Sequence, residues 1–120
     1  MSRGPPAKLD RAKVRQDFEA VVNMSAAELA EWLSTDDSRK VGWKGADGTA
    51  TESVGHACGR KTVRLLAKPA TELDDDDYLH MRRTVGFVRR LSAQRPENIY
   101  TSRWRYSLMN WGHDPVKEDR

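Results

Sequence analysis

The sequence has one cysteine and no long apolar run, and both absences limit what this protein can be. With Cys58 as the only thiol, no disulfide can form within the chain, which favours a reducing compartment. No apolar stretch approaches the roughly 20 residues needed to span a bilayer. The N-terminal stretch MSRGPPAKLDRAK also lacks the apolar segment of a secretion signal. We therefore expect a cytoplasmic protein that makes no membrane contact.

The few histidines and the one cysteine are not spaced as metal ligands. The chain has three histidines and contains no CxxC, HExxH or HxxxH pattern. His56 and Cys58 are two residues apart, so on a helix their side chains would point about 200° away from each other. Neither GxxxxGK[ST] nor GxGxxG occurs. Because no nucleophile, base and orienting group can be assembled from motifs, we predict a non-enzymatic protein with no catalytic residue, metal or cofactor.

The composition predicts one folded domain with a highly charged surface. Of 120 residues, 38% are hydrophobic and the mean hydropathy is -0.80, but four Trp, three Tyr and two Phe can bury large areas. The length fits a single domain. We expect a flexible N-terminal arm over residues 1–8, a helical domain over residues 9–115 and a C-terminal tail over residues 116–120, with fraying from His113 onward.

Hydrophobic periodicity predicts an all-α fold of about five helices. The first is expected over residues 9–22. The second begins at Ser25, because Ser25 followed three residues later by Glu28 forms a capping box. Three further helices are expected, with N-caps at Thr51 or Ser53, at Asp74, and at Thr101 or Ser102.

The positions of the glycines support two structural predictions. Gly55 and Gly59 are four residues apart on the third helix, which would let another helix approach closely. The stretch 35–50 is rich in glycine and aspartate, so we expect one longer loop there, anchored by Val41 and Trp43.

The longest predicted helix is DDDDYLHMRRTVGFVRRLSAQ, over residues 74–94. Four acids stand at its start and two arginines near its end, which is the charge order that a helix dipole favours. We therefore interpret the acids as helix-start residues and not as calcium ligands. The apolar residues of this helix fall on one side and should face the core: Tyr78, Met81, Val85, Val88 and Leu91. The core is also expected to include Trp32, Trp104, Leu108 and Trp111.

Positive charge is concentrated in one segment, residues 82–105. This segment has seven arginines, no lysine and one acid, so it carries a net charge of +6 and leaves -3 for the rest of the chain. The arginines are Arg82, Arg83, Arg89, Arg90, Arg95, Arg103 and Arg105. Arginine suits bidentate phosphate or carboxylate contacts and stacks on aromatic rings.

Three interpretations of this segment stay open. The first is a solvated surface whose arginines pair with acids elsewhere, for instance Asp36, Asp37 and Glu52. The second, which we favour, is a nucleic-acid surface, with double-stranded DNA as the first expected partner and Trp104 or Tyr106 as a stacking or supporting ring. The third is a surface for a protein partner, in an interaction or stress-related accessory module that does not bind nucleic acid.

Several blocks of the sequence are distinctive, namely RWRYSLMNWGHDP, VNMSAAELAEWL, ESVGHACGR and DDDDYLHMRRTVGFVRR. On these blocks the chain resembles, from about Phe18 to Pro115, the domain-of-unknown-function family DUF3140, a family of small uncharacterised bacterial and fungal proteins. Some members of that family carry the label DNA-binding. The resemblance implies no catalytic residues.

Overall fold

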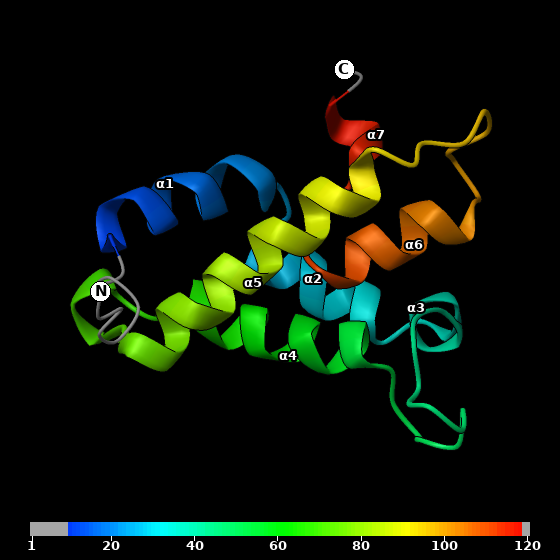
Figure 1. Cartoon of the computed structure of the whole chain (residues 1–120), viewed down its shortest axis with the longest axis horizontal. Coiled ribbons are helices and arrows are strands. Elements are labelled where there is room, and N and C mark those ends of the chain that lie inside the picture. Colours follow the sequence, from blue (N-terminus) through cyan, green and yellow to red (C-terminus); the bar gives the residue numbers. More distant parts are fainter. Residues whose placement is uncertain (1–9, 119–120) are drawn as a thin grey trace, which may run out of the picture.

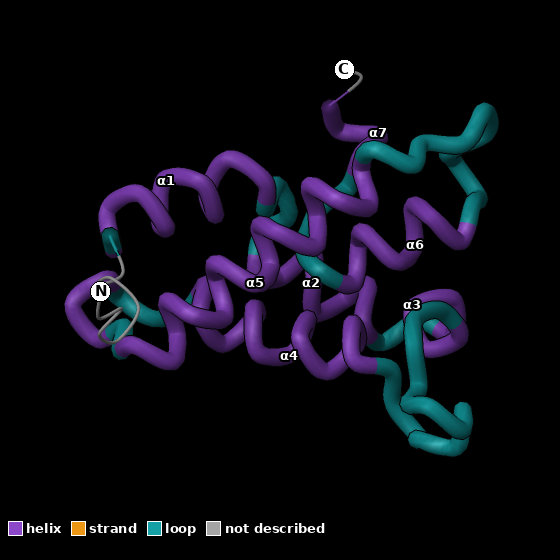
Figure 2. Tube along the Cα trace, in the orientation of Figure 1, coloured by secondary structure: helices purple, strands orange, loops and turns teal. Residues whose placement is uncertain are grey.

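The computed structural model describes residues 10–118, and all regular structure in that range is helical (Figures 1 and 2). The elements are α1 (Arg11–Val21), α2 (Ala26–Leu33), α3 (Asp36–Lys40), α4 (Val54–Leu66), a 3₁₀ turn (Ala70–Glu72), α5 (Asp75–Ser92), α6 (Arg103–Asn110) and α7 (Pro115–Glu118). The predicted all-α class is confirmed, and the five longer helices are those expected from the sequence. The predicted arm over residues 1–8 lies outside the described residues.

Side-chain caps determine where the helices begin. Ser25 and Glu28 form the predicted capping box at α2, and of the alternatives left open Ser53 caps α4 and Ser102 caps α6. Asp74 caps α5 by accepting from the Asp77 amide at 2.9 Å, and the Asp77 carboxylate accepts from Lys68 Nζ at 2.9 Å. The acids at the beginning of α5 are therefore helix-start residues, as predicted.

Helix α5 lies at the centre of the arrangement (Figure 1). It packs against α1 on one side and contacts α6 on the other, while α4 packs against α2. The short helix α6 contacts four other helices, α2, α3, α4 and α5. Residues far apart in sequence therefore meet around α6.

The predicted core side of α5 is largely confirmed. Tyr78, Met81, Val85 and Val88 are buried and Leu91 is half-buried. The other predicted core residues also pack into the core. Leu108 and Trp111 are buried, and Trp32 and Trp104 are partly buried and pack against core clusters. The indole nitrogen of each needs a polar partner: Trp32 donates to Asn110 Oδ1 at 2.7 Å and Trp104 donates to the Leu91 carbonyl at 2.6 Å.

The predicted close approach at Gly55 and Gly59 is confirmed, and the partner is the C-terminal end of α6. A β-carbon placed on Gly59 would lie 2.3 Å from the Asn110 carbonyl oxygen and 2.9 Å from a methyl group of Leu33. A β-carbon on Gly55 would lie 3.0 Å from the indole nitrogen of Trp111. The two glycines thus let α4 and α6 meet almost backbone to backbone.

The segment expected to be one long loop is partly helical. Helix α3 occupies residues 36–40 and is capped by Thr35, whose hydroxyl accepts from the Ser38 amide. Val41 anchors the segment as predicted, with 2% of its surface exposed, but Trp43 does not, because 65% of its surface is exposed. A helix of five residues has too few periodic positions to be detected in the sequence.

The C-terminal segment is packed onto the domain, so the prediction of a frayed tail from His113 is wrong for the part described. His113, Asp114 and Pro115 are buried, and α7 follows directly. His113 Nδ1 lies 2.6 Å from the Val21 carbonyl, and the Asp114 amide donates to Asn23 Oδ1 at 2.7 Å. These polar contacts cannot be inferred from hydrophobic periodicity. Residues 119 and 120 lie outside the described range.

A buried histidine joins α4 to α5. His80 is 6% exposed, and its Nε2 lies 2.9 Å from the hydroxyl of fully buried Thr62. Burial, together with the nearby positive charges of Lys61 and Arg83, lowers the pKa of His80 from 6.5 to about 4. His80 is therefore neutral in the folded protein at neutral pH.

This shift predicts a loss of stability in mild acid. Between pH 6.5 and 4 the unfolded chain protonates His80 and the folded protein does not, so the free energy of unfolding falls as the pH falls. From pH 7 to pH 5 the expected loss is about 2 kcal/mol. Urea denaturation at both pH values should show this loss in the wild type and a clearly smaller one in His80→Gln. Equal losses in the two proteins would contradict the assignment to His80.

Candidate functional site

The structure places the seven arginines in different surroundings. Arg105 is half-buried, and its guanidinium donates to both carboxylate oxygens of Asp114, at 3.1 and 3.2 Å, and to the Tyr100 carbonyl at 2.6 Å. These bonds hold the segment after α6 onto the domain, so Arg105 has a structural role. Arg95 and Arg103 lie on the loop after α5 and at the beginning of α6, and the Arg95 guanidinium carbon is 5.9 Å from the centre of the Trp104 ring.

The four arginines of α5 form two rows. Residues seven apart lie within about 20° on a helix, so Arg82 and Arg89 form one row and Arg83 and Arg90 the other. All four are exposed. Arg89 lies beside α1, with Nη2 3.5 Å from Asp17 Oδ1. Arg83 and Arg90 lie on the other flank of α5, where they line a pocket.

The expected pairing of this segment with distant acids occurs at other acids. Arg89 pairs with Asp17 and Arg105 with Asp114. Glu52, one of the acids named from the sequence, bonds instead to Arg60, which donates to both of its oxygens at 2.7 Å, and to His56. Arg60, and then His56, lower the pKa of Glu52 to about 2.

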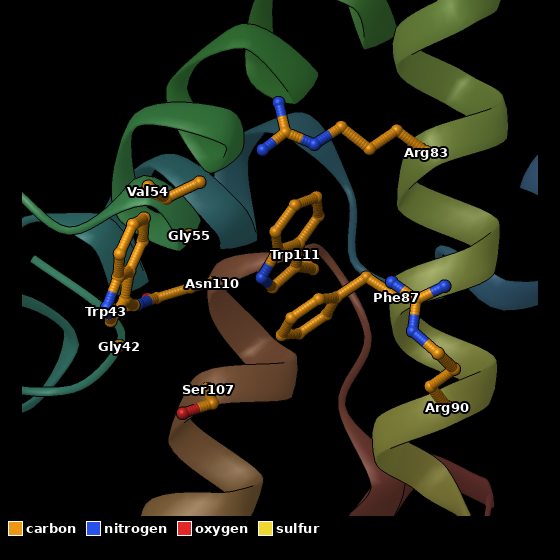
Figure 3. Close-up of a pocket in the computed structure, with 10 residues that line it drawn as sticks. All are labelled: Gly42, Trp43, Val54, Gly55, Arg83, Phe87, Arg90, Ser107, Asn110 and Trp111. Carbon is orange, nitrogen blue, oxygen red and sulfur yellow. The ribbon is translucent and has the colours of Figure 1, made fainter. Parts of the chain in front are cut away.

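The pocket has a volume of about 240 Å³ and lies where α5, α6 and the beginning of α4 meet the loop after α3. Its residues are Gly42, Trp43, Val54, Gly55, Arg83, Phe87, Arg90, Ser107, Asn110 and Trp111 (Figure 3). Three aromatic rings and two arginines, contributed by three separate parts of the chain, therefore surround one small space.

One wall of the pocket is a stacked pair of rings. Phe87 and Trp111 lie nearly parallel, at an angle of 17°, with their centres 4.2 Å apart. The Arg83 guanidinium carbon is 5.7 Å from the centre of the Trp111 ring, so a cation lies over that ring. Stacking fixes the two rings in orientation, and this wall is a rigid aromatic platform.

Trp43 stands on the opposite side of the pocket from Phe87 and Trp111 (Figure 3). Its backbone is fixed, because its carbonyl accepts from the Val54 amide at 2.9 Å. Gly42 permits this contact: it has φ of +99°, and a β-carbon there would lie 2.8 Å from Ser53 Oγ. The Trp43 side chain is nevertheless 65% exposed, so a large ring is held at the pocket and left open to solvent.

The polar groups of the pocket differ in whether they are already hydrogen-bonded within the protein. The Asn110 side chain is engaged inside the protein, by Trp32 and by Ser38. The Ser107 hydroxyl and the indole nitrogen of Trp111 lie on the pocket side (Figure 3). The site thus offers a flat apolar surface, two guanidinium groups and a few hydrogen-bonding groups.

The aromatic residues of this site were not the ones expected from the sequence. The sequence suggested Trp104 or Tyr106 beside the arginines. Trp104 lies beside Arg95 and bonds to the Leu91 carbonyl, and Tyr106 packs on Trp32 with ring centres 5.2 Å apart, so neither ring lines this pocket. One signal was present in the sequence, because Phe87 lies four residues after Arg83 and three before Arg90 and so shares their face of α5.

Among residues 10–118, the cysteine and the potential metal ligands do not form a catalytic or metal site. Burial raises the pKa of the Cys58 thiol, which makes it a poor nucleophile. Across residues 10–118, no three His, Cys, Asp or Glu side chains are grouped so that they could hold a metal ion. Over the same residues, no helix combines the length and apolarity required to cross a bilayer.

Fold and site together define a small all-helical domain with an arginine-flanked aromatic pocket. The family model described as "Protein of unknown function (DUF3140)" matches residues 17–109, and the chain belongs to this family. This confirms the resemblance drawn from the sequence blocks. No curated protein and no solved structure matches the chain significantly.

Proposed function

We propose that this protein is a small non-enzymatic nucleic-acid-binding protein that contacts phosphates through arginine. The observation that carries the proposal is the row formed by Arg83 and Arg90, two exposed arginines on one flank of α5 beside a solvent-open aromatic pocket. Arginine and aromatic rings together are the usual means of holding a nucleic-acid backbone and its bases.

The spacing of the row supports phosphate contact. Seven residues of helix rise about 10.5 Å, which is close to the rise along the duplex axis over roughly three phosphates of one DNA strand. Arg82 belongs to the other row of α5, and its positive charge adds to the field of this helix surface. Arg105 is left out of this surface, because it bonds to Asp114 and Tyr100. A cytoplasmic location belongs to the same proposal, since Cys58 is a free thiol.

Salt dependence is the direct test. Binding driven by counterion release should weaken with salt, with a slope of log affinity against log salt near -0.9 per phosphate neutralised on duplex DNA. Several contacts would give a slope of roughly -3 to -5. The double variant Arg83→Gln/Arg90→Gln should flatten the slope by about two and still fold, because glutamine keeps helix propensity and removes only charge. The measurement is a salt titration of duplex binding.

A matched control removes the same charge elsewhere. Arg39→Gln/Arg64→Gln changes two exposed arginines that line a different groove, beside Leu33 and Val63. Its slope should stay close to that of the wild type. If the wild type does not bind even at low salt, or if both double variants flatten the slope equally, Arg83 and Arg90 do not form a phosphate surface. The protein-interaction interpretation would then take its place.

A further inference from the structure

The aromatic pocket has features that phosphate contact alone does not require. A duplex backbone could be held by arginines on a plain helix surface. Here Arg83 and Arg90 instead border a space with the Phe87–Trp111 pair on one side and the exposed ring of Trp43 on the other (Figure 3). The Trp43 side chain is 65% exposed at the edge of this space, while its backbone carbonyl accepts from the Val54 amide.

The size of the pocket limits its occupant. Sites for drug-sized ligands measure roughly 300–1,000 Å³, and this pocket measures about 240 Å³. It is therefore too small for a folded segment or a large cofactor, and it suits one flat ring system. Three of its lining residues are aromatic, and aromatic rings favour stacking.

The charge of the pocket limits the occupant further. Two arginines border it, and of its ten lining residues none is acidic. An anionic group attached to the ring would lie near guanidinium groups that can bind it in bidentate fashion. The Ser107 hydroxyl and the indole nitrogen of Trp111 could bond to polar atoms at the ring edge. A nucleotide combines a flat ring of this kind with a phosphate.

From this geometry we infer that the pocket takes one unpaired nucleotide of a single strand, with its base between Trp43 and the Phe87–Trp111 pair and its flanking phosphates at Arg83 and Arg90. This inference rests on the proposed function and specifies its substrate. A base within a duplex is stacked on both faces by its neighbours and cannot enter between protein rings, whereas an unpaired base offers both faces. Single-stranded nucleic acid is thus preferred to the duplex DNA expected from the sequence.

The test compares a labelled single strand of roughly 12 nucleotides, a length within the usual site sizes, with the matching duplex. Wild type should bind the single strand more tightly. Trp43→Ala should weaken single-strand binding by roughly 5- to 150-fold, the loss expected for one stacked base. It should leave the salt slope unchanged, because no phosphate contact is removed. Trp43→Phe, which keeps a ring, should retain most of the affinity. Because Trp43 is exposed, these variants should fold normally.

A matched control is Tyr100→Ala, which removes another exposed ring, 60% exposed, that does not line the pocket. It should bind both nucleic acids as the wild type does. The inference is overturned if Trp43→Ala binds the single strand normally, or weakens single strand and duplex equally. It is also overturned if free AMP competes as well as the strand, since the site would then serve a mononucleotide.

These failures are distinguishable from failure of the proposed function. If the wild type binds duplex with a steep salt slope and Trp43→Ala has no effect on either nucleic acid, the base pocket is wrong and the phosphate surface stands. If the wild type binds neither single strand nor duplex at low salt, both are wrong.

Discussion

Replacing Gly59 with alanine is expected to destabilise the protein by about 3 kcal/mol, the upper part of the usual range for overpacking a core. The added β-carbon would lie 2.3 Å from the backbone oxygen of Asn110, which cannot rotate away, and 2.9 Å from Leu33, which is buried. Helices α4 and α6 would have to separate. The loss would be a large share of the roughly 5–15 kcal/mol that holds a domain together.

Gly86→Ala is the matched control for this variant. Gly86 lies within α5, and a β-carbon there would meet only the end of the flexible Arg90 side chain, at 3.3 Å. Alanine is favoured over glycine within a helix by about 1 kcal/mol, so this variant should be as stable as the wild type or more stable. Urea denaturation of both variants provides the comparison. A Gly59→Ala protein with an unchanged midpoint would show that α4 and α6 do not meet in this way.

Replacing Asn110 with alanine is also expected to lower the free energy of unfolding by about 3 kcal/mol. The cause here is the loss of buried hydrogen bonds and not a change in packing. The Asn110 side chain is 1% exposed and joins three helices. Its oxygen accepts from Trp32 on α2 and from the Ser38 hydroxyl on α3, and its amide donates to the Ser38 carbonyl at 3.0 Å. Each buried polar group that loses its partner costs about 1–3 kcal/mol.

A double-mutant cycle separates this network from a general effect of truncation. Ser38→Ala removes one donor to Asn110. The double variant Ser38→Ala/Asn110→Ala should therefore lose less stability than the sum of the losses in the two single variants. Asn98→Ala is the control, because Asn98 is exposed and bonds only within its own turn, to the Tyr100 amide. Additive losses at Ser38 and Asn110 would be evidence that the two residues act separately.

Local chemistry in the sequence was enough to predict the helices. A cap such as Ser25 or Asp74 and the apolar period that follows it involve only neighbouring residues, so the beginnings of α2 and α5 could be predicted to the residue. The core side of α5 followed from the same periodicity. The failures at α3 and at the C-terminal segment have the opposite cause. Residues 36–40 are too few to show a period, and His113 and Asp114 are held by bonds to residues about 90 positions away.

Only the tertiary structure decided which aromatic residues surround the arginines. In the sequence Trp43, Trp104 and Trp111 are equally apolar, but Trp111 is buried beside Gly55, Trp104 bonds to the carbonyl at the end of α5, and Trp43 is exposed. The sequence by itself determined that this chain has large aromatic rings and a segment with a net charge of +6. Three of these rings meet two of these arginines in one pocket, and α4 and α6 approach each other beside it through Gly55 and Gly59. Such a contact between distant segments leaves no periodic signal in either one.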